Sequence, residues 1–399
     1  MLNGIHLVDF GNHRNTRLTF GPMTALVGQN GSGKTTVMRA VGEISSNILF
    51  REPYLNQSLK RSRASEAIVT ASWPKLASSG NLDWGLRLGR EGRWLIRKRR
   101  PTKAEETWVP QPFGETDDLT PRSFNKYQLG LDELRFSTMS PGEIACFSES
   151  SVTWSARYFK TSARSLQAPA LADDEEPLIN DDGSNLAWAL SYLMTAEPER
   201  FAAILSALKE VVPVVRRIRS RPVKLTRLVK QTITINKQDR TFDEEREVMG
   251  QELIFDMKSG DGLPATAVSE GTLVVLAILT LVYGSDADLI MLDDVELGLH
   301  PKAQRDLIRQ LRRIQETHPK LQILVSTHSP YIVDEFKAED VWVFAPDAEG
   351  CAVAKRLSDH PEAKRALEVL TTGEFWSAEG EPWVLGEEAT ARVAEEPGA

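Results

Sequence analysis

The stretch GQNGSGKT, residues 28–35, constrains the fold of this chain more than any other feature. It fits the phosphate-loop pattern G-x-x-x-x-G-K-[ST], with a strand-like stretch before it and a helix-like stretch after it. Glycines at these spacings let backbone N–H groups turn toward an anion, and the helix N-terminus adds its dipole. A glycine-rich turn beside a surface lysine is the alternative. The strand and helix on either side favour a nucleotide-binding α/β fold.

The loop predicts ATP and Mg²⁺ as cofactors. Lys34 is expected to reach the terminal phosphates, and the Thr35 hydroxyl is expected to ligate Mg²⁺. The residues predicted to bind the nucleotide in this loop are Gly28, Asn30, Gly31, Ser32, Gly33, Lys34, Thr35 and Thr36.

A run of aliphatic residues, LIMLDD at 289–294, ends in two neighbouring carboxylates. A phosphate loop needs a second strand whose end delivers a carboxylate to the metal, and Asp293 fits that role. Asp294 then occupies the place of the general base that orients the attacking water. Two acids that only keep a strand end soluble are the alternative, but the phosphate loop upstream favours catalysis.

The order of apolar segments indicates an α/β sheet with parallel strands. From residue 265 onward helix-like and strand-like stretches alternate, at 271–283, 287–293, 301–316 and 321–326. Residues 66–100 instead favour antiparallel strands, most clearly a hairpin of 83–88 with 93–99. Pro198 is expected in the first turn of a helix within a helical insertion.

Composition limits the setting in which such a fold works. The 399 residues carry a net charge of −8, and the longest apolar run, at 272–283, is shorter than a bilayer-spanning helix. The first residues lack the basic start and long apolar stretch of a signal peptide, so we expect a cytoplasmic protein without membrane contact. Cys146 and Cys351 lie far apart and suggest neither a disulfide framework nor a zinc site.

Two stretches are strongly basic although the total charge is negative. Residues 87–103 hold eight Lys or Arg against one Glu, and residues 216–230 hold seven against none. Such stretches fit DNA phosphates or, alternatively, a solvated protein face.

Four segments together, LVGQNGSGKTT, VSEGTL, LIMLDDVELGLHP and ILVSTHSPYIVD, resemble the ABC-type ATPases of the RecF and SMC branch. More narrowly, they resemble short AAA-family ATPases related to overcoming-lysogeny-defect proteins, a group that includes abortive-infection and phage-defence ATPases. DGSNLA at 182–187 and TGEFW at 372–376 extend the resemblance to most of the chain except roughly residues 101–165. Nothing at 345–399 resembles the Toprim nuclease of larger relatives.

The resemblance implies a homodimer that closes around ATP. Ser269 and Gly271 resemble the signature motif, which would contact the γ-phosphate bound to the opposite subunit, although a Ser-Glu-Gly at a helix start is also a common cap. LGLH at 297–300 resembles the D-loop that crosses the dimer. His328 resembles the switch histidine that senses the γ-phosphate. A glutamine linking the metal to the rest of the subunit is expected between 50 and 130, and its candidates are Gln57, Gln111 and Gln128.

These motifs divide the chain into five expected parts. They are an ATPase lobe with the phosphate loop at 1–65, an antiparallel β-subdomain at 66–115, a loop-rich and helical insertion at 116–250, an ATPase lobe with the signature, the two acids and the switch histidine at 251–345, and a C-terminal extension at 346–399.

One departure from the family pattern concerns the general base. Related ATPases have Asp-Glu where this chain has Asp293-Asp294, and an aspartate carboxylate reaches about 1 Å less far, an error that costs on the order of 10²-fold in rate. We therefore expect slow hydrolysis, catalysed by Asp294 with Lys34 and His328.

Two functions of different class follow. The chain is either an ATPase that uses hydrolysis to act on DNA or on an effector in phage defence or DNA maintenance, or an ATP-gated dimeric scaffold with negligible hydrolysis. A nuclease or toxin encoded nearby is the expected effector. A transporter ATPase subunit is a weaker alternative, because such subunits carry Leu-Ser-Gly-Gly-Gln rather than Ser-Glu-Gly.

Overall fold

The computed structural model describes residues 1–48, 67–73, 82–88, 95–97, 108–110, 155–171, 177–235 and 238–386. They form two compact units. Unit 1 comprises residues 1–158, 287–295 and 312–399, and unit 2 comprises residues 159–286 and 296–311. The grouping differs from the five predicted parts, because residues 251–286 fold with the insertion in unit 2 and not with the strands that follow them.

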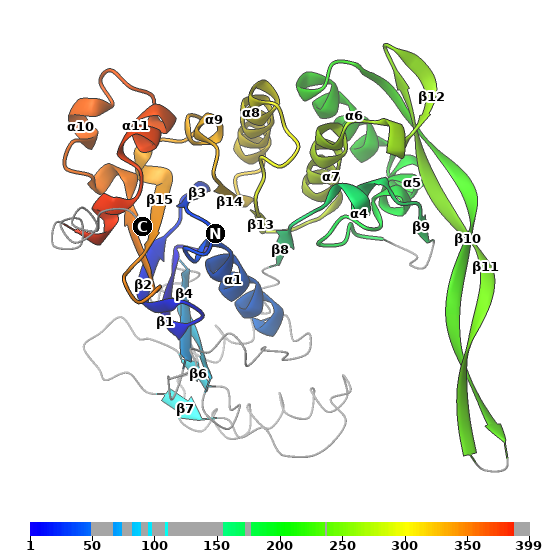
Figure 1. Cartoon of the computed structure of the whole chain (residues 1–399), viewed down its shortest axis with the longest axis horizontal. Coiled ribbons are helices and arrows are strands. Elements are labelled where there is room, and N and C mark those ends of the chain that lie inside the picture. Colours follow the sequence, from blue (N-terminus) through cyan, green and yellow to red (C-terminus); the bar gives the residue numbers. More distant parts are fainter. Residues whose placement is uncertain are drawn as a thin grey trace, which may run out of the picture. The chain divides into compact units, whose positions relative to one another are not determined.

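A six-stranded mixed sheet forms the centre of unit 1, with the order β16-β15-β3-β14-β13-β8 (Figure 1). The four strands β13, β14, β3 and β15 are parallel, and β16 is antiparallel to β15. The predicted α/β fold with a mixed sheet is confirmed. The strands are β3 (Met23–Gly28), β8 (Ala156–Phe159), β13 (Leu289–Leu292), β14 (Gln322–Thr327), β15 (Val341–Pro346) and β16 (Ala352–Arg356).

The central strands are largely apolar because they are covered on both faces. Every residue of β3, β13 and β14 is buried. The helices that follow these strands are α1 (Lys34–Ile48), α8 (Pro301–Thr317) and α9 (Pro330–Val333). The strand and helix order predicted for 287–326 agrees with the structure.

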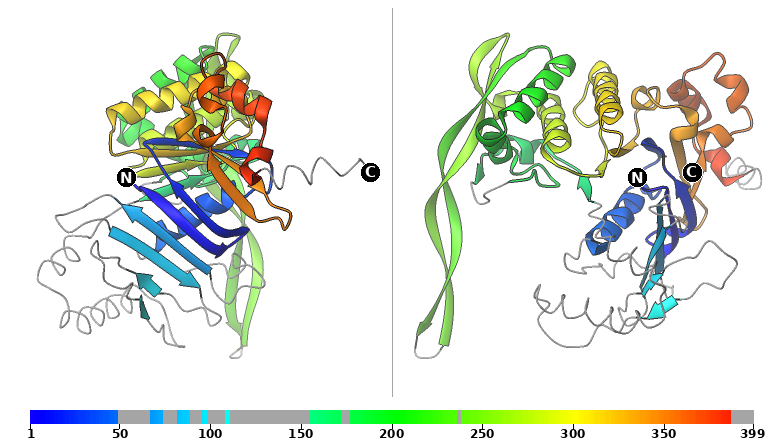
Figure 2. Two further views of the ribbon diagram at one scale, coloured as in Figure 1. Left: turned by 90° about the vertical axis from the view of Figure 1, so that its left-hand side faces the viewer. Right: turned by 180° about the vertical axis from the view of Figure 1, so that it is seen from behind.

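A second sheet of unit 1 is antiparallel, as residues 66–100 predicted, with the order β2-β1-β4-β5 (Figure 2). Its strands are β1 (Gly4–Phe10), β2 (His13–Thr19), β4 (Ala67–Trp73) and β5 (Leu82–Leu88). The predicted pairing of 83–88 with 93–99 is not among the described strand pairs, and residues 93, 94, 98 and 99 lie outside the described residues. Among the described residues β5 pairs with β4, and β6 (Leu95–Arg97) pairs with β7 (Trp108–Pro110). The buried Val69 and Ala71 fix β4 beside β1, and the other edge of β4 takes β5.

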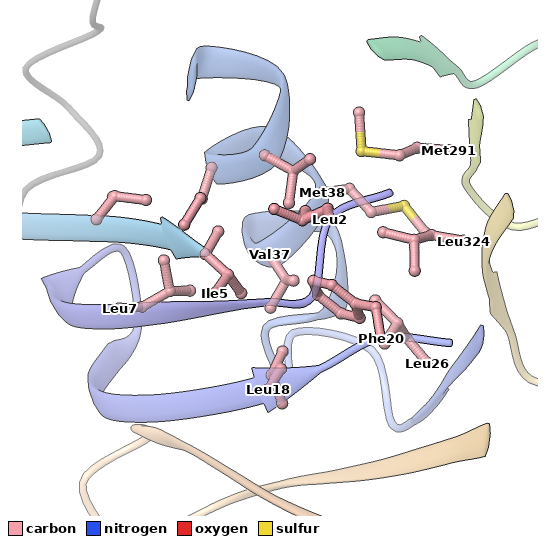
Figure 3. Packing of buried hydrophobic residues seen from close by; sticks show 14 of the residues in the cluster. Leu2, Ile5, Leu7, Leu18, Phe20, Leu26, Val37, Met38, Met291 and Leu324 are labelled. Carbon is pink, nitrogen blue, oxygen red and sulfur yellow. The ribbon is translucent and has the colours of Figure 1, made fainter. Parts of the chain in front are cut away.

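The hydrophobic core of unit 1 joins both sheets to α1 (Figure 3). Ile5 comes from β1, Val37 and Met38 from α1, and Met291 and Leu324 from the central sheet, and all are almost completely buried. Removing a single large side chain from such a core typically costs about 2–5 kcal/mol. This core holds the first turns of α1, and therefore the phosphate loop, in a fixed place.

The C-terminal part of unit 1 packs beside the segment that follows β14. Its short helices are α10 (Ala363–Ala366) and α11 (Thr372–Glu379), with single 3-10 turns at Ala338–Asp340, Leu357–Asp359 and Pro382–Leu385. The Gly373 N–H donates to Asp334 Oδ1 over 2.8 Å, and a Cβ at Gly373 would lie 2.0 Å from the Pro330 carbonyl oxygen. The motif TGEFW therefore packs directly against α9.

Unit 2 contains a group of buried helices. They are α4 (Ala163–Gln167), α5 (Leu186–Ala196), α6 (Pro198–Val211), α7 (Glu270–Gly284) and the start of α8, with a 3-10 turn at Ala265–Ala267. Pro198 opens α6 as predicted, and residues 271–282 of α7 are buried throughout, which accounts for the apolar run at 272–283. Within the described part of the chain, no helix combines the length and apolarity needed to cross a membrane.

A long two-stranded ribbon extends from the sheet of unit 2 (Figure 1). Its strands β10 (Val215–Ile235) and β11 (Gln238–Met257) pair antiparallel along their length, and β9 (Ala170–Leu171) and β12 (Gly260–Pro264) pair with β11. Within the insertion predicted at 116–250, these residues form the ribbon and not loops or helices. The basic strand faces an acidic one, so ion pairs form across the ribbon: Arg219–Asp256, Arg221–Glu252 and Lys224–Glu247.

Gln322 is predicted to hold the start of the chain on the central sheet. Its fully buried side chain accepts from the Leu2 N–H over 2.9 Å and donates to the carbonyls of Leu2 and Gly21 over 2.9 and 2.8 Å. The substitution Gln322→Met keeps the size but removes these three bonds. We expect it to lower the free energy of unfolding by about 2–3 kcal/mol in urea titrations.

Gln315→Met is the matched control, because Gln315 makes one long bond of 3.4 Å to the Leu321 carbonyl. Equal small losses in both variants would contradict the role given to Gln322.

Candidate functional site

The phosphate loop joins β3 to α1 and requires glycine at two positions. Gly28 has φ 136°, and a Cβ there would lie 2.2 Å from the Phe344 carbonyl oxygen of β15. Gly33 has φ 109°, and a Cβ there would lie 2.7 Å from His13 Nε2 and 2.9 Å from Ala352 Cβ. Neither backbone angle nor space admits a side chain. The loop is therefore seated against β15, β16 and the start of β2.

The interior of the loop fits a triphosphate. The Ser32 side chain is fully buried, and its hydroxyl has no hydrogen-bond partner. Gly31 has φ 77°, and the space beside its Cα is open to at least 4 Å. Lys34 Nζ donates to the carbonyls of Gly28 and Gln29 over 2.6 and 2.9 Å. Phosphate oxygens would satisfy the buried hydroxyl and accept from the lysine, which is the chemistry that an anion site needs.

The other two predicted loop residues lie at its margins. Asn30 is exposed at the tip of the loop, and Thr36 is half-buried in the first turn of α1. A Cβ on Gly11 would lie 2.5 Å from Thr36 Cγ2, so Thr36 packs on the β1–β2 turn. Nucleotide contacts by these two residues remain predictions.

Asp293 directly follows β13 and receives hydroxyl donors from neighbouring segments. Its carboxylate is almost completely buried. Thr35 Oγ1 lies 3.0 Å from Oδ2 and 3.2 Å from Oδ1, and the Ser326 hydroxyl of β14 donates to Oδ1. The structure thus brings together the two predicted metal residues, Thr35 and Asp293. Where described, the chain holds no group of three or more His, Cys, Asp or Glu placed to hold a metal ion. Thr35 and Asp293 would offer Mg²⁺ one hydroxyl and one carboxylate.

Asp294 adopts a left-handed backbone conformation with φ 53°. Its N–H donates to Ser326 Oγ over 2.8 Å, so the turn after β13 is fastened to β14. Asp and Asn tolerate this conformation better than other non-glycine residues, which gives a local reason for Asp at this position. His328 follows β14, and its Nε2 lies 4.0 Å from Asp294 Oδ1 with both side chains partly exposed. The predicted base and switch histidine therefore face each other.

Tyr158 is a site residue that the sequence did not reveal. It lies in β8, next to β13 in the sheet, and its hydroxyl donates to Asp293 Oδ2 over 2.8 Å. Burial and the adjacent Asp293 carboxylate raise the pKa of the Tyr158 hydroxyl, which therefore stays protonated and acts as a donor. No spacing in the sequence links residue 158 to residue 293, because only the strand order of the folded sheet brings them together.

His13 is a second such residue. Its ring is fully buried, with Nε2 3.1 Å from the Gly33 carbonyl and Nδ1 2.9 Å from Thr16 Oγ1. Burial lowers the pKa of His13 to about 4, and the hydrogen bond to Gly33 opposes this effect. A neutral imidazole donates from Nε2 to Gly33 and accepts at Nδ1 from Thr16. His13 therefore supports the backbone between the phosphate loop and α1.

The predicted signature and D-loop residues lie together in unit 2. Ser269 is the N-cap of α7, with its Oγ 3.4 Å from the Thr272 N–H and 2.7 Å from Thr272 Oγ1. A Cβ on Gly271 would lie 2.4 Å from the Gly298 carbonyl oxygen, so glycine lets the D-loop approach α7 closely. Ser269 thus caps α7, which was the alternative interpretation of the Ser-Glu-Gly sequence. Contact with a nucleotide on a second copy remains a prediction.

Several predicted features lie outside the described residues. Gln57, Gln111 and Gln128 are among them, as are most of the first basic stretch and Cys146. Cys351 is buried and not in a disulfide. In the second basic stretch, four cations have acidic partners: Arg216, Arg219, Arg221 and Lys224.

A phosphate loop on a mixed sheet, with a carboxylate at the end of a neighbouring parallel strand, defines a P-loop nucleotide-binding fold. Residues 5–42 match an AAA domain family, and residues 161–334 match the family described as "AAA domain, putative AbiEii toxin, Type IV TA system". The fold is similar to the Smc head bound to the C-winged helix domain of ScpA, with a TM-score of 0.50 and 14% identity over 92% of this chain and 99% of that one. The resemblance to ABC-type ATPases of the RecF and SMC branch is confirmed.

Curated relatives match shorter segments. The retron Ec83 probable ATPase of Escherichia coli is 27% identical over 105 residues, which cover 23% of this chain and 19% of that protein. The DNA replication and repair protein RecF of Paenarthrobacter aurescens (strain TC1) is 29% identical over 106 residues, 26% of each chain. The matched segments therefore span about a fifth and about a quarter of these two relatives.

Acid is predicted to destabilise unit 1 through His13. Its pKa is 6.5 in the unfolded chain and about 4 in the fold, so the unfolded state binds the proton first. Stability present above pH 6.5 is then lost as the pH falls toward 4, and the loss at pH 5 is about 2 kcal/mol. We expect urea titrations at pH 7 and pH 5 to show this loss in the parent and a smaller one in His13→Gln.

Carboxylates that titrate in the same window contribute equally to both proteins, so only the difference between parent and variant reports on His13. Identical losses in the two would contradict the prediction.

Proposed function

We propose that the chain binds ATP with Mg²⁺ and that the nucleotide joins two copies, with the phosphate loop of one facing Ser269 and Gly271 of the other. The observation that carries the proposal is the pairing of Thr35 with Asp293 at 3.0 Å, beside the glycine loop and Lys34. In P-loop NTPases a hydroxyl and a carboxylate so placed hold the metal that bridges the β- and γ-phosphates. The unpartnered Ser32 hydroxyl and the closely packed Gly271 support the same interpretation.

Hydrolysis in the proposed complex is slow. Asp294 acts as the general base, and His328, whose Nε2 lies 4.0 Å from Asp294 Oδ1, would donate to the γ-phosphate. The aspartate side chain is one methylene shorter than the glutamate of related ATPases. A poorly placed base retains only part of the roughly 10²- to 10⁴-fold that general-base catalysis contributes.

The cellular role that we propose is phage defence or DNA maintenance, in the cytoplasm and together with an effector such as a nuclease or toxin. Support comes from the names of the relatives, a retron ATPase and RecF, and from the AbiEii-type family match. DNA is a proposed ligand.

Lys34→Ala is predicted to abolish nucleotide-dependent assembly. Loss of the charged donor should weaken Mg²⁺–ATP binding about 10- to 100-fold, measured by calorimetry, because hydrogen bonds to charged groups contribute about 1.5–3 kcal/mol each. Sizing with a non-hydrolysable ATP analogue should show a dimer for the parent and a monomer for the variant. Lys337→Ala is the control, since Lys337 is a largely exposed lysine of the same unit.

Ser269→Arg separates binding from assembly. It should bind the analogue as the parent does but remain monomeric, whereas Ser285→Arg at the other end of α7 should dimerise normally. A parent that binds no nucleotide would overturn the proposal, and a Ser269→Arg dimer would overturn the role of the signature.

The second candidate function is an ATP-gated scaffold without significant turnover. It is favoured by the short Asp294 side chain and its fixed left-handed turn. Asp294→Asn distinguishes the two. If Asp294 is the base, the parent hydrolyses ATP slowly and the variant at least about tenfold more slowly, measured as phosphate release.

Equal and negligible turnover in both proteins, with the analogue-induced dimer intact, would instead establish the scaffold. The isosteric amide preserves the turn, because Asn tolerates the left-handed conformation as well as Asp does.

A further inference from the structure

We propose that Tyr158 is a positioning residue that couples occupancy of the metal site at Asp293 to the peptide leading into unit 2. The inference rests on the proposed binding of ATP and Mg²⁺. It concerns one hydroxyl group, which bonds Asp293 Oδ2 over 2.8 Å.

The hydroxyl is what distinguishes Tyr158 from a packing residue. Tyr158 is partly buried and packs against the core of unit 1 together with Ala156. A phenylalanine would serve this packing equally well and would not place a polar group beside a buried carboxylate. The tyrosine adds a donor to Asp293, the carboxylate proposed to hold Mg²⁺.

The strand that carries Tyr158 is fastened to β13 at both ends. At its start, the Asp288 and Leu289 N–H groups donate to the Ser155 carbonyl over 2.9 and 3.1 Å, and the Ser155 N–H donates to Asp288 Oδ2 over 2.9 Å. At its far end the Tyr158 hydroxyl makes the bond to Asp293. The bonds at the start join Ser155 to Asp288 and Leu289 and do not involve the metal residues. The bond at the far end is made to Asp293, which is a proposed metal ligand.

The chain leaves unit 1 immediately after Tyr158. Phe159 is the first residue of unit 2, and the next segment is ordered by the Lys160 N–H bond to the Asp181 carbonyl over 2.9 Å and by the Ser162 cap of α4. Besides the pairing of β8 with β13, the Tyr158 side chain and one peptide bond therefore connect Asp293 to this segment.

A metal held by Asp293 would compete with the Tyr158 bond. Three hydroxyls, from Thr35, Ser326 and Tyr158, now share the two carboxylate oxygens. A divalent cation held by Asp293 would compete for the lone pairs of the carboxylate and so weaken these donors. Thr35 would turn to the metal, and Ser326 lies in an inner strand of the sheet. Tyr158 lies in the edge strand β8, and it is the donor whose displacement would reach the segment that begins at Phe159.

Hydrogen exchange tests the inference on the full chain. The parent and Tyr158→Phe are compared with ATP analogue plus Mg²⁺ and with ATP analogue plus EDTA, following the amides of residues 159–167. We expect Mg²⁺ to change the exchange rate of Lys160 and its neighbours at least threefold in the parent and less than 1.5-fold in Tyr158→Phe. Both proteins should bind the analogue in EDTA with affinities within threefold, because the phosphate loop is untouched.

Tyr283→Phe is the matched control, since it removes a half-buried tyrosine hydroxyl of unit 2 that is hydrogen-bonded to Gln310. It should respond to Mg²⁺ like the parent. A full Mg²⁺ response in Tyr158→Phe overturns the coupling and leaves the proposed function intact. Equal exchange rates of the 159–167 amides with Mg²⁺ and with EDTA in the parent would also overturn the coupling, and this comparison needs no variant. A parent that binds no analogue overturns the proposed function and the coupling together.

Discussion

The burial of the Asp293 carboxylate is the interaction on which the rest of the site depends. A buried charge is tolerated only when hydrogen bonds or opposite charges compensate for lost water. Here three hydroxyls do so, and each comes from a different element: α1, β14 and β8. One carboxylate thus fixes the phosphate-loop helix, the strand that precedes His328 and the strand that leads to unit 2. The same oxygens would attract a divalent cation in the proposed complex, so the group that organises the site is also the group that the metal would reorganise.

The turn that follows Asp293 explains why the second acid of the pair is Asp. The bond from the Asp294 N–H to Ser326 and the φ of 53° hold the backbone in a region where short polar side chains are favoured. Two demands oppose each other at this position. The turn favours a short polar side chain, whereas a general base would need the longer reach of a glutamate. A glutamate would extend the carboxylate but fit the turn less well, whereas Asp fits the turn and gives up about 1 Å of reach. If Asp294 is the general base, slow hydrolysis would follow from local conformation as well as from side-chain length.

Features that depend on short stretches of sequence were predictable. The phosphate loop, Asp293, the helix at Pro198 and the parallel strands from 287 onward each follow from spacing or periodicity within a few residues, and the structure places them as expected. Tyr158 and His13 were not predictable, because their partners lie 135 and 20 residues away and are reached only through the order of strands. The ribbon was missed for another reason. Its first strand, β10, is rich in basic residues, and these obscured the alternating pattern typical of a strand. In the fold, the acidic strand β11 lies opposite and compensates their charge.

The ribbon also shows why a basic stretch of sequence is not the same as a basic surface. Residues 216–230 hold seven cations and no acids, yet the antiparallel register puts the acidic strand opposite, and Arg219, Arg221 and Lys224 each lie within 3 Å of a carboxylate there. Exposed pairs of this kind contribute little to stability, about 0–1 kcal/mol each, but they lower the local charge that a phosphate backbone would experience. A DNA ligand would have to displace these carboxylates or bind elsewhere. The charge of this ribbon is therefore better suited to fixing the register of its two strands than to attracting nucleic acid from a distance.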